Sequence, residues 1–395
     1  MTPSPELFAV AVLLFVAIAA YALFAGADFG GGIWDLLAGG DQRGARPREA
    51  IDISVTPVWE GNHVWSIFVL VILWTAFPPA FAAIMTALFV PIALALLGIF
   101  FRGIGFAFRH EAQRLHLQRL NGAIFAISSL MAPFFLGTVI GAVATGAVPP
   151  RPAGEVPGAW TSTTALVTGG LFVATCAYIG AIYLVVDSEH RDDPAMARYF
   201  SHRALAAGLA TGVLAAVNLL LMRTSAPYVF DRLVGPALPL LAVSVVAGIA
   251  ALVLVALRRS PHVLRICASL AVAAVVAGWG WAQYPWLLPG SMTLLQGAAP
   301  SATLWTELAV TGLAVVLVFP GFGWLYWLQQ HGRLHESKTH EDLHLATAAP
   351  GEPLTAPPSP APVQREHKVV ATVLIATVAT ELVRQLLERR RNRRG

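Results

Sequence analysis

Nine long apolar stretches constrain this chain more than any other feature of its sequence. They cover approximately residues 7–25, 58–77, 80–101, 122–143, 162–186, 203–222, 235–257, 266–283 and 304–328. A spanning helix needs about 20 apolar residues, because about 30 Å of hydrocarbon is crossed at about 1.5 Å per residue. A membrane β-barrel would instead show short segments in which apolar and polar residues alternate. We therefore expect an all-α, polytopic transmembrane bundle of nine spans, whose first span is retained rather than cleaved as a signal peptide.

The distribution of charge predicts the orientation of the bundle. Charged residues make up only 12% of the chain, whereas soluble proteins carry about 25%, so a cytosolic enzyme is excluded. With nine spans, all but three of the 26 lysines and arginines fall on one side, the exceptions being Arg151, Arg223 and Arg232. The positive-inside rule then predicts an outer N-terminus and a cytoplasmic C-terminus. The basic residues behind the net charge of +4 therefore mark the cytoplasmic face and do not indicate a nucleic-acid-binding site. Eight helices and a ninth leave room for two four-helix halves.

The last 65 residues have a different composition, so we divide the chain into a membrane domain, 1–330, and a cytoplasmic tail, 331–395. Within the tail, residues 345–366 are rich in proline and alanine and are typical of a linker. Residues from about 368 to 388 predict a short amphipathic helix that is followed by an arginine cluster. Such a helix favours contact with anionic lipid at the membrane surface.

Ionisable residues at membrane depth are the functional candidates, because each costs about 2.5–3.5 kcal/mol to insert. The clearest are Asp28, Glu60 and His63. On a helix, Glu60 and His63 share a face with Trp59. These groups can relay protons inward from the cytoplasm, or Glu60 and His63 can simply brace the second helix. Glu307, near the outer headgroups, is given no role.

Other chemistry has little support in the sequence. His63 is the only histidine embedded in a predicted span, and a lone histidine more often hydrogen-bonds a neighbour than binds a metal. Neither a phosphate-binding glycine loop nor a serine elbow is present. Arg102 and Arg109 lie seven residues apart on one helix face, where they can bind lipid headgroups or acidic groups of a partner, or anchor the helix by snorkelling. We expect neither a catalytic residue nor a metal ligand on this chain.

Several stretches resemble subunit II of the cytochrome bd-type quinol oxidases. The order and spacing agree over roughly residues 5–330, in the stretches 26–30 (GADFG), 59–65 (WEGNHVW), 100–109 (FFRGIGFAFR), 177–181 (AYIGA) and 278–285 (GWGWAQYP). The resemblance implies the family's nine-span topology and a heterodimer in the bacterial cytoplasmic membrane. The larger partner, subunit I, would carry the b- and d-type haems and the quinol site and would reduce dioxygen to water. Subunit II would contribute contacts to lipid or to a structural quinone, and part of a cytoplasmic proton path.

The resemblance also implies roles for individual residues. Glu60 stands where the family has an aspartate, and we predict that it is the main proton carrier, with Asp28 as a helper and His63 as a modulator. The expected partner or lipid contacts are Trp59, Asn62, Trp65, Arg102 and Arg109. The chain departs from the family pattern in three places. Ala25 replaces the first acidic residue of the glycine-containing loop, His63 replaces an acidic or amide residue, and the tail after His331 has no counterpart.

Two other classes of protein remain open at this stage. A proton-coupled secondary transporter would use Asp28 and Glu60 to bind its coupling ion near the cytoplasmic side. A purely structural assembly subunit would leave both carboxylates idle. Co-purification with a haem-containing polypeptide favours the oxidase, whereas a colourless, self-sufficient protein favours the transporter.

Overall fold

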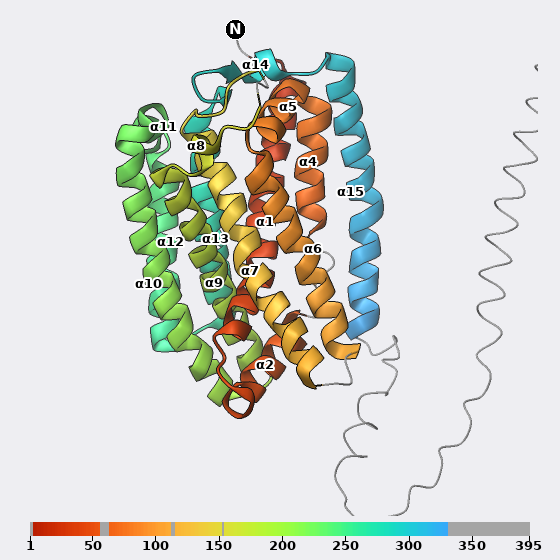
Figure 1. Cartoon of the computed structure of the whole chain (residues 1–395), viewed down its shortest axis with the longest axis vertical. Helices are drawn as coiled ribbons and strands as arrows, with labels where there is room; N and C mark the ends of the chain where they lie inside the picture. The colour runs from red at the N-terminus through yellow and green to blue at the C-terminus, as the bar shows by residue number, and fades with distance from the viewer. Residues whose placement is uncertain (1–2, 56–62, 112–114, 152–153, 331–395) are drawn as a thin grey trace, which may run out of the picture. The chain divides into compact units, whose positions relative to one another are not determined.

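The computed structural model describes residues 3–55, 63–111, 115–151 and 154–330. The chain divides into two units, residues 1–321 and 322–395. The first unit is a bundle of helices that run mostly side by side (Figure 1). One two-stranded antiparallel sheet, β1 with β2, interrupts the helices among the described residues. The all-α class predicted from the apolar stretches is confirmed.

The elements follow one another with short connections. In chain order they are α1 (Pro5–Leu36), α2 (Asp41–Val55), α4 (Val64–Ala76), α5 (Pro78–Ala87), α6 (Phe89–Glu111), α7 (Leu115–Ala144), α8 (Pro157–Trp160), α9 (Thr163–His190), α10 (Pro194–Ser225), α11 (Pro227–Leu233), α12 (Leu238–Leu257), α13 (Pro261–Gln283), β1 (Trp286–Leu288), β2 (Met292–Thr293), α14 (Leu294–Gly297) and α15 (Ser301–Gln330).

Each of the nine apolar stretches coincides with helix in the described residues. Seven helices are long and apolar enough to cross a membrane: α1, α7, α9, α10, α12, α13 and α15. The bent pair α5 and α6 makes an eighth candidate. The described part of the second stretch is the shorter apolar helix α4, which begins just after the undescribed residues 56–62. A count of nine spans therefore stays a prediction.

The third expected span, 80–101, is not one continuous helix. It is broken at Leu88, where α5 and α6 meet at 87°. Pro91 has no N–H to donate to the carbonyl of Ala87 four residues earlier, and its ring crowds that carbonyl. The Ala87 carbonyl instead accepts the backbone N–H of Val156, at 2.9 Å. The stretch therefore stays a candidate span, but one with a sharp bend that a distant loop helps to satisfy.

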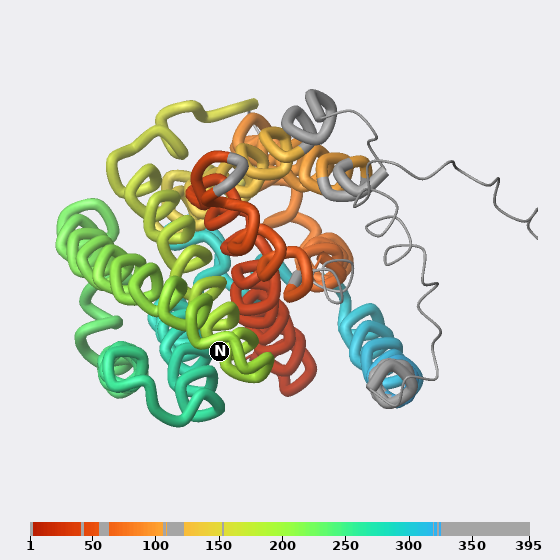
Figure 2. The backbone as a smooth tube through the Cα atoms, turned by 90° about the horizontal axis from the view of Figure 1, so that it is seen from below, coloured from red at the N-terminus to blue at the C-terminus, as the bar shows by residue number. Residues whose placement is uncertain are grey.

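Helix α1 is packed on several sides, against α4, α7, α9 and α13. Figure 2, which looks along the bundle, shows the red α1 among these neighbours. Its closest approach is to α9 at Gly30 and Gly180, where a methyl group on either glycine would collide with the other helix backbone. The indole N–H of Trp34 also donates to the carbonyl of Ala177 on α9, at 2.8 Å. A single cluster of buried apolar side chains therefore includes residues from both of the four-helix halves that the sequence suggests.

Several basic loops gather at one end of the bundle, where Figure 1 shows α2. Arg46 of α2 pairs with Asp193 at 2.9 Å, Arg191 donates to Ser54 at 2.6 Å, and Arg265 of α13 pairs with Asp187 at 3.1 Å. The backbone N–H of Met196 lowers the pKa of the Asp193 carboxyl, with help from Arg46. The short elements α8, α11 and α14 lie at the other end (Figure 1). These contacts agree with alternating spans, and the side of the membrane on which each end lies stays a prediction.

We predict that Gly30→Ala lowers the thermal stability of the protein. The added methyl would overlap the Cys176 carbonyl oxygen and would lie 2.8 Å from the Gly180 Cα. Overpacking of this kind costs about 1–3 kcal/mol. The matched control is Gly170→Ala on α9, where nothing lies within 4 Å of the added methyl. Tryptophan fluorescence of the detergent-solubilised protein measures both unfolding midpoints, and equal midpoints for the two variants would contradict the close packing.

Candidate functional site

A buried ion pair joins three helices inside the bundle. The Asp28 side chain on α1 is fully buried, and the Arg102 side chain on α6 is 3% exposed. Arg102 Nε donates to Asp28 Oδ2 at 3.0 Å, and Nη2 donates to Oδ1 and to the Asp28 backbone carbonyl, both at 2.7 Å. Nη1 donates to the Ser129 hydroxyl of α7. Both carboxylate oxygens are thus engaged by one guanidinium, the geometry in which such pairs are strongest.

Local sequence explains how the guanidinium fits between the helices. A methyl group at position 32 would lie 2.8 Å from Arg102 Nη1 and would overlap Ser129, so the glycine there leaves the necessary room. The rings of Phe29 and Phe125 lie near the guanidinium carbon, with centroids at 5.4 Å and 4.4 Å. Aromatic faces attract a desolvated cation. The pair is therefore enclosed by groups that favour the charge of the arginine.

His63 lies beside this pair, at the N-cap of α4. Its Nε2 is 3.6 Å from Asp28 Oδ2, and its side chain is 18% exposed. The rings of Phe29 and Tyr21 lie 5.6 Å and 6.3 Å from the imidazole. The His63 Nδ1 atom and the Tyr21 hydroxyl are buried without a hydrogen-bond partner among the described residues. The centre thus combines a fixed ion pair with one titratable ring.

The structure brings together three residues selected from the sequence: Asp28, His63 and Arg102. Arg102 differs from expectation, because its side chain is buried inside this chain rather than turned to lipid or to a partner. Trp65 is half-buried, and its ring stacks on Phe24 at 6.1 Å. Trp59, Glu60 and Asn62 lie outside the described residues, as does the side chain of Arg109.

Sequence reasoning missed the contribution of α7. Ser129, which hydrogen-bonds Arg102, and Phe125, which underlies its guanidinium, come from a helix that had no candidate residue. The signal that could have found the pair is that Asp28 and Arg102 follow closely on the first and third apolar stretches. No group of three or more His, Cys, Asp or Glu able to hold a metal ion occurs in the described part of the chain.

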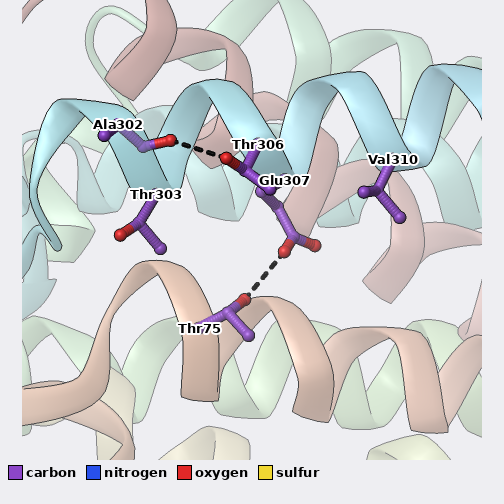
Figure 3. Close-up of a pocket in the computed structure, with 6 residues that line it drawn as sticks. All are labelled: Thr75, Ala302, Thr303, Thr306, Glu307 and Val310. Atoms are coloured by element: carbon purple, nitrogen blue, oxygen red, sulfur yellow. Dashed lines mark hydrogen bonds between the residues drawn. The ribbon is translucent and has the colours of Figure 1, made fainter. Parts of the chain in front are cut away.

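A second polar position lies between α4 and α15, near the end opposite α2. There the Thr75 hydroxyl donates to Glu307 Oε2 at 2.9 Å, at the side of an open pocket of about 340 Å³ (Figure 3). Threonines 303 and 306 of α15 contribute to the same pocket. This carboxylate is only half-buried and faces a neutral hydroxyl, in contrast to Asp28. The contact ties α15, the least buried of the seven long apolar helices, to α4.

Comparisons with known proteins identify relatives of the chain. The family model for cytochrome bd terminal oxidase subunit II matches residues 7–329. The chain is 28% identical over 135 residues to the cytochrome bd-I ubiquinol oxidase subunit 2 of Escherichia coli K12, covering 34% of this chain and 35% of the relative. It is 23% identical over 322 residues to a putative cytochrome bd menaquinol oxidase subunit II of Bacillus subtilis, covering 78% of this chain and 90% of the relative.

A solved structure supports the same fold. The bd oxidase from Geobacillus thermodenitrificans matches with a TM-score of 0.65 and 20% identity, covering 82% of this chain and 98% of the matched chain. The chain spans only about a third of the length of the first curated relatives that it matches.

We predict that Arg102→Leu strongly destabilises the protein, because it leaves the Asp28 carboxylate buried without a partner. Breaking one side of a buried ion pair costs about 3–5 kcal/mol. The double variant Asp28→Asn with Arg102→Gln removes both charges and should regain much of this loss. Arg198→Leu is the control, since Arg198 is exposed. The yield of folded protein in membranes and its unfolding midpoint measure the effect, and a single variant as stable as the control would contradict the prediction.

Proposed function

The chain belongs to the cytochrome bd terminal oxidase subunit II family, and from this premise we propose that it is a membrane subunit of a respiratory quinol oxidase that reduces dioxygen to water. The observation that carries the proposal is the length of the family match, residues 7–329, which includes all nine apolar stretches. The apolar helices of the structure indicate a multi-pass membrane protein. A bacterial cytoplasmic membrane is the location that this function requires.

Within this proposal the haems and the quinol site belong to a partner, subunit I. The one embedded histidine of the described residues, His63, turns Nε2 toward Asp28. We assign no electron-transfer step to this chain within the proposal. Its contribution is to hold the partner in the membrane and to conduct protons.

The proposed proton path enters on the cytoplasmic side near Glu60, Asp28 and His63. Glu60 is the main carrier, and it precedes His63 by three residues in the sequence. The contacts between His63 and Asp28 support a shared entrance, because they place a titratable ring beside a buried carboxylate. Asp28 acts as a helper through its negative charge, which favours protons in this region of low dielectric.

Purification of the native complex tests the proposed function. We expect the chain to co-purify with a haem-containing polypeptide and the preparation to consume oxygen when quinol is supplied. The measurements are the absorption spectrum, the subunit composition and the rate of oxygen consumption. A colourless preparation that contains this chain alone and transports a solute would contradict the proposal and favour the transporter.

We predict that Glu60→Gln slows oxygen reduction by the assembled complex while its haem spectrum stays unchanged. The amide cannot carry a proton, and loss of a proton-transferring side chain costs about 10²-fold or more in rate. Glu307→Gln is the matched control, because it makes the same change at a half-buried carboxylate of α15 that hydrogen-bonds Thr75. Oxygen consumption and proton uptake are measured for both. Equal turnover in the Glu60 variant and the wild type would rule out the carrier role.

A further inference from the structure

The three ionisable groups of the buried centre differ in their freedom to change charge. The guanidinium of Arg102 stays protonated at every accessible pH. Protonating Asp28 would remove the partner of this cation, whose side chain is 3% exposed, and would leave its charge uncompensated. Protonating His63 leaves the ion pair intact and adds a cation beside the same carboxylate. Among these three groups, the imidazole is therefore the one that can take up a charge without breaking the ion pair.

The position of His63 also suits exchange rather than bracing. At 3.6 Å, its distance to Asp28 Oδ2 exceeds the 2.7–3.2 Å of an N–H···O hydrogen bond but lies within ion-pair range, whereas Arg102 binds the carboxylate at hydrogen-bond distance. Its side chain is 18% exposed, whereas the Asp28 side chain is fully buried. His63 is thus the most exposed of the three side chains, although its Nδ1 atom is itself buried.

We propose that His63 is the proton-carrying residue of this centre, and that Arg102 holds Asp28 as a permanent anion beside it. This proposal rests on the proposed function and deepens it, since His63 then does more than modulate. In the neutral ring, Nε2–H faces Asp28 and Nδ1 presents its lone pair, which has no partner among the described residues. A proton binds at Nδ1 to form the imidazolium and leaves from the same nitrogen, without any change in electrons.

The groups that face the ring from the described helices support this assignment. Helix α1 contributes Asp28, Phe29 and Tyr21, and Arg102 of α6 binds the same Asp28 carboxylate. On its own helix α4, the Ser66 hydroxyl donates to the His63 carbonyl at 2.7 Å. Farther away, Ser129 and Phe125 of α7 contact Arg102, and Cys176 of α9 lies against α1 near Gly26. Asp28 and Arg102 are the charged groups in this described set, and they neutralise each other.

The test is the pH profile of oxygen consumption by the purified complex with saturating quinol, from about pH 5 to 8, where histidine changes charge. His63→Gln keeps a polar side chain that cannot carry a proton. We expect this variant to lose one titration step of the wild-type profile and to turn over about 10²-fold more slowly, with an unchanged haem spectrum. The matched control is His262→Gln, which changes an exposed histidine whose ring lies 5.1 Å from that of His190.

A second variant keeps the proposal falsifiable if His63→Gln assembles poorly. In His63→Gly the vacated space admits free imidazole, which should restore turnover in proportion to its unprotonated fraction, a response that a bracing role would not give. A His63→Gln complex with the wild-type pH profile and rate, or a His63→Gly complex unaffected by imidazole, would overturn the proposal. A wild-type complex without quinol-dependent oxygen consumption would instead contradict the proposed function.

Discussion

The ion pair between Asp28 and Arg102 is the constraint on which the rest of the bundle depends. Two unit charges removed from water cost several kcal/mol each, and only close geometry with further hydrogen bonds offsets that cost. Here one guanidinium binds both carboxylate oxygens, a backbone carbonyl and the Ser129 hydroxyl. These bonds reach α1, α6 and α7 together, so the axial register of the three helices is determined by the pair. The glycines of α1 then allow the close packing that excludes water from it.

Much of the fold is predictable from the sequence, because hydrocarbon thickness sets the length of a span and apolar runs report it directly. The gathering of the basic loops at one end of the bundle also follows from the apolar stretches, because successive loops alternate between the two ends. The break at Leu88 was not predictable, since the Ala87 carbonyl depends on the N–H of Val156, far away in the chain. Pro91 alone does not predict a helix break, because a proline is also tolerated in a continuous membrane helix when a neighbour satisfies the freed carbonyl.

The candidate site was predictable only in part. Asp28 and His63 stand out because charge is rare at membrane depth, and they do lie side by side. Arg102 was misread because it occurs near the end of an apolar stretch, where snorkelling is the usual fate of an arginine. The direction of its side chain is decided by the ion pair with Asp28, 74 residues away in the sequence, and the pattern of one helix does not contain that information. Glycine at position 32 was the local clue, since its missing side chain makes space for the guanidinium.

In the proposed arrangement the negative charge of Asp28 is fixed by Arg102, whereas the proton is carried by the neighbouring His63. A carboxylate whose two oxygens are both bound by one arginine is a poor carrier, because each proton it took would have to break that pairing. The same carboxylate is a good fixed anion for a neighbouring ring. The imidazole of His63 lies 3.6 Å from this anion, so a proton on the ring adds a cation beside Asp28 and leaves intact the pair that holds the carboxylate.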